Sequence, residues 1–168
     1  VNYSFKKTYG HLLGRVETAF AREHPLFSLA IYYPLAHWTG DPAQKDPWAE
    51  GRQKQVVRLI RLLFLKRFES SVRAFEHSCQ TLLLKLLAFL YKNIDPNQPK
   101  ETARLKKWEI RNEEILAHVA SRRAELTEDD ESEENDLAAE YSDDFVAFPR
   151  ATYDTEQIFD ETHDALAQ

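Results

Sequence analysis

One uninterrupted run of helix-forming residues, 50–92, constrains this chain more than any other part of its sequence. The run contains no proline, and its only glycine is Gly51. At about 1.5 Å per residue, a single helix over this run would be about 65 Å long, whereas a compact domain of this chain length has a radius of gyration of about 15 Å. Because a helix of that length cannot bury itself, we expect it to pack along a second long helix.

Apolar residues recur along this run at steps of three and four, which keeps them within about a third of the helix circumference. We therefore predict one continuous buried stripe. Near the start of the run, Leu59, Leu62, Leu63 and Leu65 occupy the other faces, so we expect that end to be covered on more than one side. The stripe consists of Val57, Ile60, Phe64, Phe68, Val72, Phe75, Cys79, Leu82, Leu86 and Leu90.

The segment 93–99 contains asparagine, aspartate and proline, and it predicts the end of one helix and the start of the next. We expect a helix over residues 100–126 to fold back antiparallel to the first. The predicted fold is mainly α and elongated, and it is built on this antiparallel pair of long helices. The residues expected to face the preceding helix are Leu105, Trp108, Ile115 and Val119.

Two smaller elements are predicted before the long run. Residues 4–23 have the spacing of a short N-terminal helix, despite Gly10 and Gly14. Apolar residues alternate over 27–33, between two prolines, which is typical of a short strand. Since the sequence offers this strand no partner, we expect it to pair outside the chain, with a second copy or another domain, or to form a loop.

Charge divides the chain. Residues 128–168 hold fifteen acids and one base, whereas residues 1–127 hold thirteen acids and 21 bases. By composition we divide the chain into a helical domain 1–126, an acidic and partly disordered linker 127–152, and a short C-terminal helix 153–168. An alternative is that the acidic segment folds over a basic surface and competes with DNA there.

The long run 50–92 is itself basic, with nine lysines and arginines against three glutamates. Opposite charges three or four residues apart form a salt-bridged, solvated helix face without any ligand. The functional alternative is that the bases contact nucleic-acid phosphates. Under that hypothesis the candidates are Arg58, Arg61, Lys66, Arg67 and Arg73.

Residues 62–75, with the sequence Leu62-Leu63-Phe64-Leu65-Lys66-Arg67-Phe68-Glu69-Ser70-Ser71-Val72-Arg73-Ala74-Phe75, resemble a signature of bacterial Swi/Snf-type helicases of superfamily two. In that family the signature lies between two RecA-like motor lobes. The segment 31–34 resembles the tyrosine-proline sequence that precedes it, and residues 153–166 resemble the acidic amphipathic stretch that follows it. Between these segments the similarity lies in the order of the elements and in their general character.

The resemblance implies that the chain is a helical insert that positions the two lobes of an ATP-dependent helicase or translocase, whose lobes bind ATP and magnesium. Its partners would be those lobes and DNA. The side chains expected to contact a lobe are Phe68, Glu69, Ser70, Ser71 and Phe75.

The chain itself carries no recognisable catalytic motif. No glycine lies in a Gly-x-x-x-x-Gly-Lys-Ser/Thr sequence, so we expect no ATP hydrolysis by this chain alone. Asp160-Glu161-Thr162-His163 has the letters of a helicase DExH box, but a buried hydrophobic strand does not precede it. The six histidines are scattered without metal-ligand spacing, so no metal site is predicted.

The remaining features favour an intracellular, cytoplasmic protein. Cys79 is the lone cysteine, which excludes a disulfide framework, and its place on the apolar stripe predicts a core residue. Lys85 interrupts the most apolar segment, so a membrane span is not expected. An alternative function is a self-contained helical interaction module whose stripe pairs with a partner helix or a second copy. A third alternative is a helical enzyme, since the periodicity of a sequence does not reveal a pocket.

Overall fold

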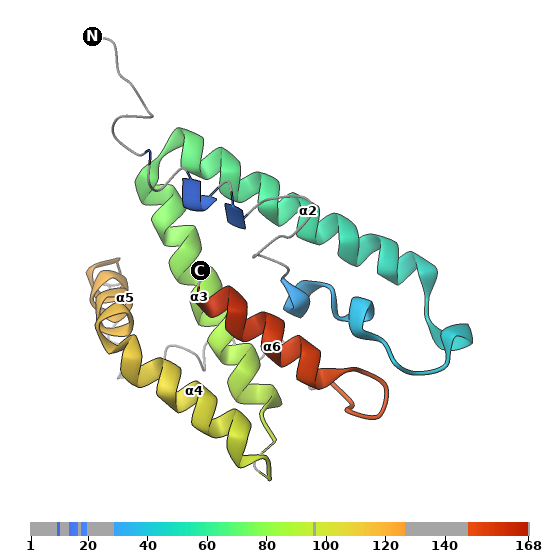
Figure 1. Ribbon diagram of the computed structural model, residues 1–168. Helices are drawn as coiled ribbons and strands as arrows, with labels where there is room; N and C mark the ends of the chain where they lie inside the picture. Colours follow the sequence, from blue (N-terminus) through green and yellow to red (C-terminus); the bar gives the residue numbers. More distant parts are fainter. Residues whose placement is uncertain are drawn as a thin grey trace. The chain divides into compact units, whose positions relative to one another are not determined.

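The computed structural model describes residues 10, 14–16, 18–19, 29–95, 97–126 and 148–167. For residues 123–126 it describes the backbone without the side chains. The chain is mainly helical, as predicted, and no strand occurs in these ranges (Figure 1). It divides into two compact units. Unit 1 comprises Val1–Glu69 and Arg150–Gln168, and unit 2 comprises Ser70–Pro149.

Unit 1 contains three short 3-10 helices, η1 (Ala30–Tyr32), η2 (Pro34–His37) and η3 (Pro42–Gln44), followed by the long helix α2 (Pro47–Ser70). The last helix of the chain, α6 (Thr155–Leu166), packs on η1 and η2. This confirms the predicted C-terminal helix, whose Asp154 side chain accepts a hydrogen bond from the backbone of Gln157 at 3.0 Å. The core between these elements includes Leu29, Ile31, Leu35, Ile158, Phe159 and Leu166.

The strand expected over 27–33 is wrong for its described part. Leu29 has a left-handed backbone, with φ 55° and ψ 49°, and Tyr32 donates to the Leu29 carbonyl at 2.8 Å to close a 3-10 turn. Pro34 then opens η2. Because Leu29 and Ile31 are both buried and η1 packs on α6, the alternating apolar residues form part of a compact turn and not a strand.

A short backbone connection joins the segment after η2 to the segment before α6. Trp38 and Tyr153 form an isolated antiparallel bridge, and their rings meet edge to face with centroids 5.1 Å apart. Asp154 donates its backbone N–H to the His37 carbonyl at 2.8 Å. At Gly40 a Cβ would lie 2.7 Å from the Trp38 ring, so a larger residue would force the ring to shift.

The continuous helix expected over 50–92 is interrupted at Ser71. Its backbone is extended, with φ −161° and ψ 121°, and its Oγ accepts a hydrogen bond from Ala74 N–H at 3.3 Å. Serine side chains compete with the helix ladder for backbone donors, and here Ser71 caps a new helix, α3 (Val72–Asn93). The single stripe is interrupted with it, since Val72 and Cys79 are exposed.

Unit 2 is built from α3, α4 (Pro99–Arg111) and α5 (Glu113–Leu126). The turn between α3 and α4 is held by Glu101, which accepts from Asp95 N–H at 3.3 Å, and by Asp95, which accepts from Asn97 N–H at 2.8 Å. Near the start of α3, Glu76 lies 3.3 Å from His118 on α5. The arm formed by α4 and α5 therefore runs antiparallel to α3, as predicted.

The helix expected over 100–126 is also interrupted, at Asn112. Its backbone N–H donates to the carbonyls of Trp108 and Glu109, which ends α4, and its own carbonyl accepts from Ile115 and Leu116 to begin α5. Leu105 and Val119 are buried as expected. Ile115 is half exposed, because the interruption shifts the phase of the apolar positions between the two helices.

The other predicted segments are described only in part. Residues 14–16 and 18–19 are helical, in line with an N-terminal helix over 4–23, and the Thr18 hydroxyl donates to the Gly14 carbonyl. The rest of that helix lies outside the described residues. The acidic stretch 127–147 also lies outside them.

Candidate functional site

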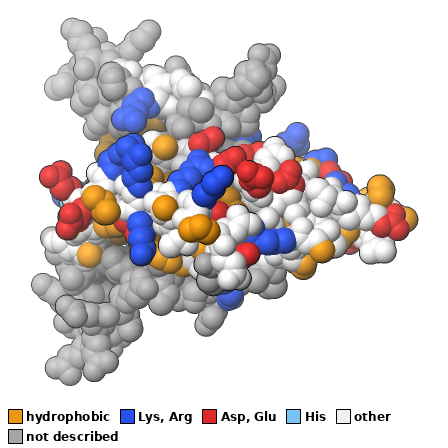
Figure 2. Space-filling view, turned by 60° about the horizontal axis from the view of Figure 1, so that its bottom comes forward, with side chains coloured by type: hydrophobic (Ala, Val, Ile, Leu, Met, Phe, Trp, Pro, Cys, Tyr) orange, Lys and Arg blue, Asp and Glu red, His pale blue; other side chains and the backbone are white. Residues whose placement is uncertain are grey.

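The predicted nucleic-acid bases do not form one surface. Arg58, Lys66 and Arg67 are exposed on α2, but Arg58 and Arg67 lie roughly two and a half turns apart and so face opposite sides of the helix. Arg61 is half-buried, and this burial lowers the pKa of its guanidinium. Arg73 is exposed on α3, in unit 2. Lysines and arginines interspersed with hydrophobic side chains are visible on the face drawn in Figure 2.

The predicted lobe-contact residues divide into two groups. Phe68 is buried and Phe75 is half-buried, so both contribute to packing within the chain. Glu69, Ser70 and Ser71 are exposed. Ser71 has the local role of capping α3, which accounts for a hydroxyl at that position without any partner domain.

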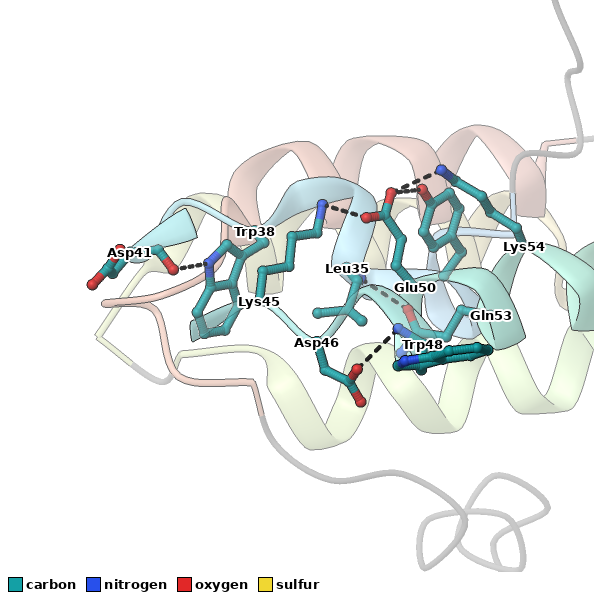
Figure 3. Close-up of polar contacts among 10 residues, drawn as sticks. Leu35, Trp38, Asp41, Lys45, Asp46, Trp48, Glu50, Gln53 and Lys54 are labelled. Carbon is teal, nitrogen blue, oxygen red and sulfur yellow. Dashed lines mark hydrogen bonds and ion pairs between the residues drawn. The ribbon is translucent and has the colours of Figure 1, made fainter. Parts of the chain in front are cut away.

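The start of α2 is fixed to the preceding 3-10 segments by a group of polar side chains that we call the Glu50 cluster (Figure 3). The Glu50 carboxylate accepts from the Tyr33 hydroxyl at 2.7 Å and lies 2.8 Å from Lys54 Nζ and 3.1 Å from Lys45 Nζ. One turn on, Gln53 accepts from Leu35 N–H at 3.1 Å. The first turns of α2 therefore have a defined position relative to η2.

The electrostatics of the Glu50 cluster follow from these contacts. Hydrogen bonds from Lys54, Tyr33 and Lys45 lower the pKa of Glu50 from 4.5 to about 2. The same contact with Glu50 raises the pKa of the Lys54 ammonium, which lies 5.6 Å above the Tyr33 ring. Burial, followed by the hydrogen bond to Glu50, raises the pKa of the Tyr33 phenol. At neutral pH the cluster is thus a fixed arrangement of one anion, two cations and a neutral phenol.

A second polar contact joins η2 to α6. His37 is buried, and its Nε2 lies 3.5 Å from the Glu161 carboxylate. The hydrogen bond to Glu161 raises the pKa of His37, and the opposing effect of burial is smaller. The four residues with DExH letters lie in the middle of α6, with Thr162 and His163 buried. They occupy a helix and not the end of a strand, as the sequence context indicated.

The most distinctive surface of unit 1 is an apolar row on α2. Trp48 is 81% exposed and Leu62 is 59% exposed, although both are large and apolar. At about 100° per residue, these side chains lie on the side of the helix opposite its buried Val57, Phe64 and Phe68. We call this row the outer stripe of α2. It consists of Trp48, Val56, Leu59, Leu62 and Leu63.

The α2 bases lie around the outer stripe. Between Glu50 and Glu69 the helix carries no acid, and Lys66 continues the line of the stripe. Near the start of α2, Arg52 pairs with Asp46 at 3.7 Å, and Asp46 also accepts from Trp48 N–H at 2.9 Å. The surface therefore combines exposed apolar groups with positive charge, which suits an apolar partner with an acidic border.

Sequence reasoning missed two features of the surface. It assigned Leu59, Leu62 and Leu63 to a covered end of the long run, whereas all three are exposed. It also overlooked a row of four bases on α4, although their spacing of four, three and four residues is a readable helical signal. We call them the α4 basic stripe. They are Lys100, Arg104, Lys107 and Arg111.

Neither a metal centre nor a membrane segment emerges from the described part of the chain. Within it, no three side chains of the metal-binding types gather closely enough to hold an ion. None of its helices combines the length and apolar character that crossing a membrane requires. Cys79 is an exposed free thiol, so its predicted place in the core is wrong.

Comparison with known proteins gives no relative for this chain. No family model matches it, and neither a curated protein nor a solved structure is similar to it. The candidate surfaces described above therefore rest on their own geometry.

Proposed function

We propose that this chain is a docking segment of a larger ATP-dependent motor, the helical insert between the two lobes of a Swi/Snf-like helicase or translocase. The observation that carries the proposal is the outer stripe of α2, which offers five apolar side chains on one helix face. The resemblance of residues 62–75 to the helicase signature supplies the kind of partner. In this proposal ATP and magnesium bind to the lobes, in the cytoplasm of a bacterial cell.

The outer stripe has the chemistry of a helix that binds in an apolar groove. Anchors at steps of three and four are the usual pattern for such helices. Fully burying one leucine side chain stabilises a complex by about 1.5–3 kcal/mol, so covering Leu59 and Leu62 would be a substantial fraction of a specific affinity. The Glu50 cluster fixes the start of α2, which reduces the ordering that docking requires.

The bases around the outer stripe would orient α2 on its partner through charged contacts. Arg58, Lys66 and Arg67 would meet acidic groups of a lobe, and this contact weakens with salt. Since Glu69 is exposed on the same helix, it is a candidate for a polar contact with a lobe. Docking in an apolar groove would account for the exposed leucines of α2. Charged contacts of the bases alone would not account for them.

The test uses the complete polypeptide that contains this chain and the double variant Leu59→Glu/Leu62→Glu. We expect DNA-stimulated ATP hydrolysis to fall at least about tenfold, because two charges in an apolar contact cost several kcal/mol. The matched control is Ala117→Glu/Ser121→Glu, which places the same charges on exposed positions of α5 in unit 2 and should leave the rate unchanged. Equal loss in both variants, or a polypeptide without ATPase activity, would contradict the proposal.

A self-contained interaction module is the second candidate, and the same outer stripe favours it. In that case α2 pairs with its counterpart in a second copy, as amphipathic helices commonly do. Sedimentation of the 168-residue chain over a range of concentrations separates the two proposals. A dimer that Leu59→Glu/Leu62→Glu dissociates supports self-pairing, whereas a monomer leaves the stripe for another domain.

A further inference from the structure

The α4 basic stripe lies on a single face of its helix. Its residues follow one another at steps of four, three and four, so at about 100° per residue they stay within a sector of about 60°. Their backbone positions span about 16 Å along the helix axis, at about 1.5 Å per residue. All four side chains are exposed: Lys100, Arg104, Lys107 and Arg111.

The acids of α4 point elsewhere. Glu101 is held at the preceding turn by its hydrogen bond from Asp95 N–H, and Glu109 lies on the far side of the helix from Lys100. Among the described residues, no carboxylate forms an ion pair with Lys100, Lys107 or Arg111. Lys100, Lys107 and Arg111 therefore present their charge to solvent, and Arg104, which has an interaction within the chain, is also exposed.

The stripe is also fixed in position. Pro99 occupies the first turn of α4, Leu105 on the opposite side is buried, and Asn112 closes the C-terminus with its hydrogen bonds to Trp108. Arg111 lies in the last turn, where a helix favours positive charge. A ligand that contacts the stripe meets four cations whose backbone spacing is already set.

We propose that the α4 basic stripe binds the phosphate backbone of a nucleic acid. One strand of duplex DNA presents a phosphate about every 3.4 Å along its axis, so a row of about 16 Å faces four or five phosphates. An anionic membrane fits less well, because a helix that lies on a bilayer needs a broad apolar face. On α4 the apolar Leu105 is buried, and the exposed apolar contribution beside the stripe is Ile110.

This inference concerns unit 2 and does not rest on docking of α2 to motor lobes. It also assigns nucleic-acid contact to residues other than those predicted from the sequence. On α2, Arg58 and Arg67 face opposite sides of their helix and Arg61 is half-buried, so the α2 bases do not form a comparable row. The two sets of bases can therefore be tested against each other in the same chain.

The test is binding of the full 168-residue chain to a short fluorescent DNA duplex over a salt series. Four phosphate contacts predict that affinity falls about a hundredfold between roughly 50 and 200 mM salt, and that the slope of log affinity against log salt is about −3.6. Replacing the stripe with glutamine should remove this dependence, with the slope falling by about one for each base. The variant is Lys100→Gln/Arg104→Gln/Lys107→Gln/Arg111→Gln.

The matched control makes the same change of charge on α2, with Arg52→Gln/Arg58→Gln/Lys66→Gln/Arg67→Gln. Glutamine is a good helix former, and far-ultraviolet circular dichroism will verify that both variants fold. Loss of binding in the α4 variant alone supports the proposal. Equal loss in both variants, loss in the α2 variant alone, or no binding of the unaltered chain at low salt would overturn it.

A second arm of the experiment separates nucleic acid from other polyanions. Vesicles of phosphatidylcholine with phosphatidylserine present the same negative charge as a fluid surface, without regular phosphate spacing along a strand. Binding to such vesicles that is as tight as binding to DNA, and is lost in the same α4 variant, would overturn nucleic acid as the ligand. Binding to DNA that exceeds vesicle binding at equal salt supports it.

Discussion

The two helices encoded by the basic run 50–92 differ sharply in their surroundings. On α3, every residue from Leu86 to Leu90 is buried, which covers all sides of the helix there. On α2, only Val57, Phe64 and Phe68 are buried, and leucines on the opposite side are exposed. A helix that is apolar all round is a core element, whereas one with mixed apolar and basic sides has a surface left for a partner.

The comparison shows that apolar periodicity alone does not distinguish packing from docking. Both helices have apolar residues at steps of three and four. They differ in the charge between those residues, since α2 carries a base in almost every turn from Arg52 to Arg67, whereas the end of α3 has only Lys85 before Lys92. Charge within the apolar pattern is therefore the better indicator of an exposed helix face.

The largest effect should come from a truncation on α3. Phe89 is 0% exposed, and Phe89→Ala is expected to reduce the free energy of unfolding of unit 2 by about 3–5 kcal/mol, through lost burial and the cavity left behind. Leu62→Ala on α2 is the paired variant and should change stability by less than about 0.5 kcal/mol. Hydrogen exchange of peptides from each helix measures both. Similar losses in the two variants would mean that the outer stripe of α2 is a core surface.

The boundary between the two helices gives the next largest effect. Ser71→Ala removes the side chain that accepts from Ala74 N–H, and N-cap losses of this kind cost about 0.5–2 kcal/mol. We expect faster amide exchange in the first turn of α3, with α2 unaffected. Ser71→Asp keeps an acceptor at the same position and should behave like the native chain. Unchanged exchange in Ser71→Ala would show that the interruption does not depend on the cap.

Sequence patterns predicted the helical class because long-range packing and local preference agree there. Pro99 marks the start of α4, Asp154 caps α6, and the apolar positions of α6 match its buried face. The antiparallel arrangement of α3 with the arm of α4 and α5 also follows from the turn-forming residues that separate them. At each of these positions the local sequence favours a single local structure, which is the one observed.

The interruptions could not be predicted in the same way. Ser71 and Asn112 are tolerated within a helix and are equally suited to ending or starting one, so the choice depends on tertiary packing. At Leu29, burial of the side chain compensates for a left-handed backbone that the sequence gives no reason to expect. The candidate bases on α2 were chosen by local density, and density does not report which side of a helix each base faces.

The attachment of α2 can be tested through Glu50. Its pKa is lowered to about 2 in the folded protein, so its contribution to stability is present above about pH 4.5 and is lost as the pH falls towards 2. Glu50→Gln should increase amide exchange in the first turns of α2 at neutral pH and abolish this acid dependence. Glu69→Gln, which removes an exposed carboxylate from the same helix, is the control. A carboxyl of Glu50 that titrates near 4.5 by NMR would contradict the cluster.

The smallest effect should come from His37, which attaches η2 to α6 in unit 1. Because the contact with Glu161 raises the pKa of His37, the pair stabilises unit 1 fully below about pH 6.5, and this contribution is lost as the pH rises through the folded value. NMR titration of the His37 ring measures that value, which Glu161→Gln should shift down towards 6.5. Glu156→Gln removes an exposed charge from the same helix and should leave it in place. A His37 ring that titrates at or below 6.5 in the unaltered chain would show that the pair of His37 and Glu161 does not hold α6.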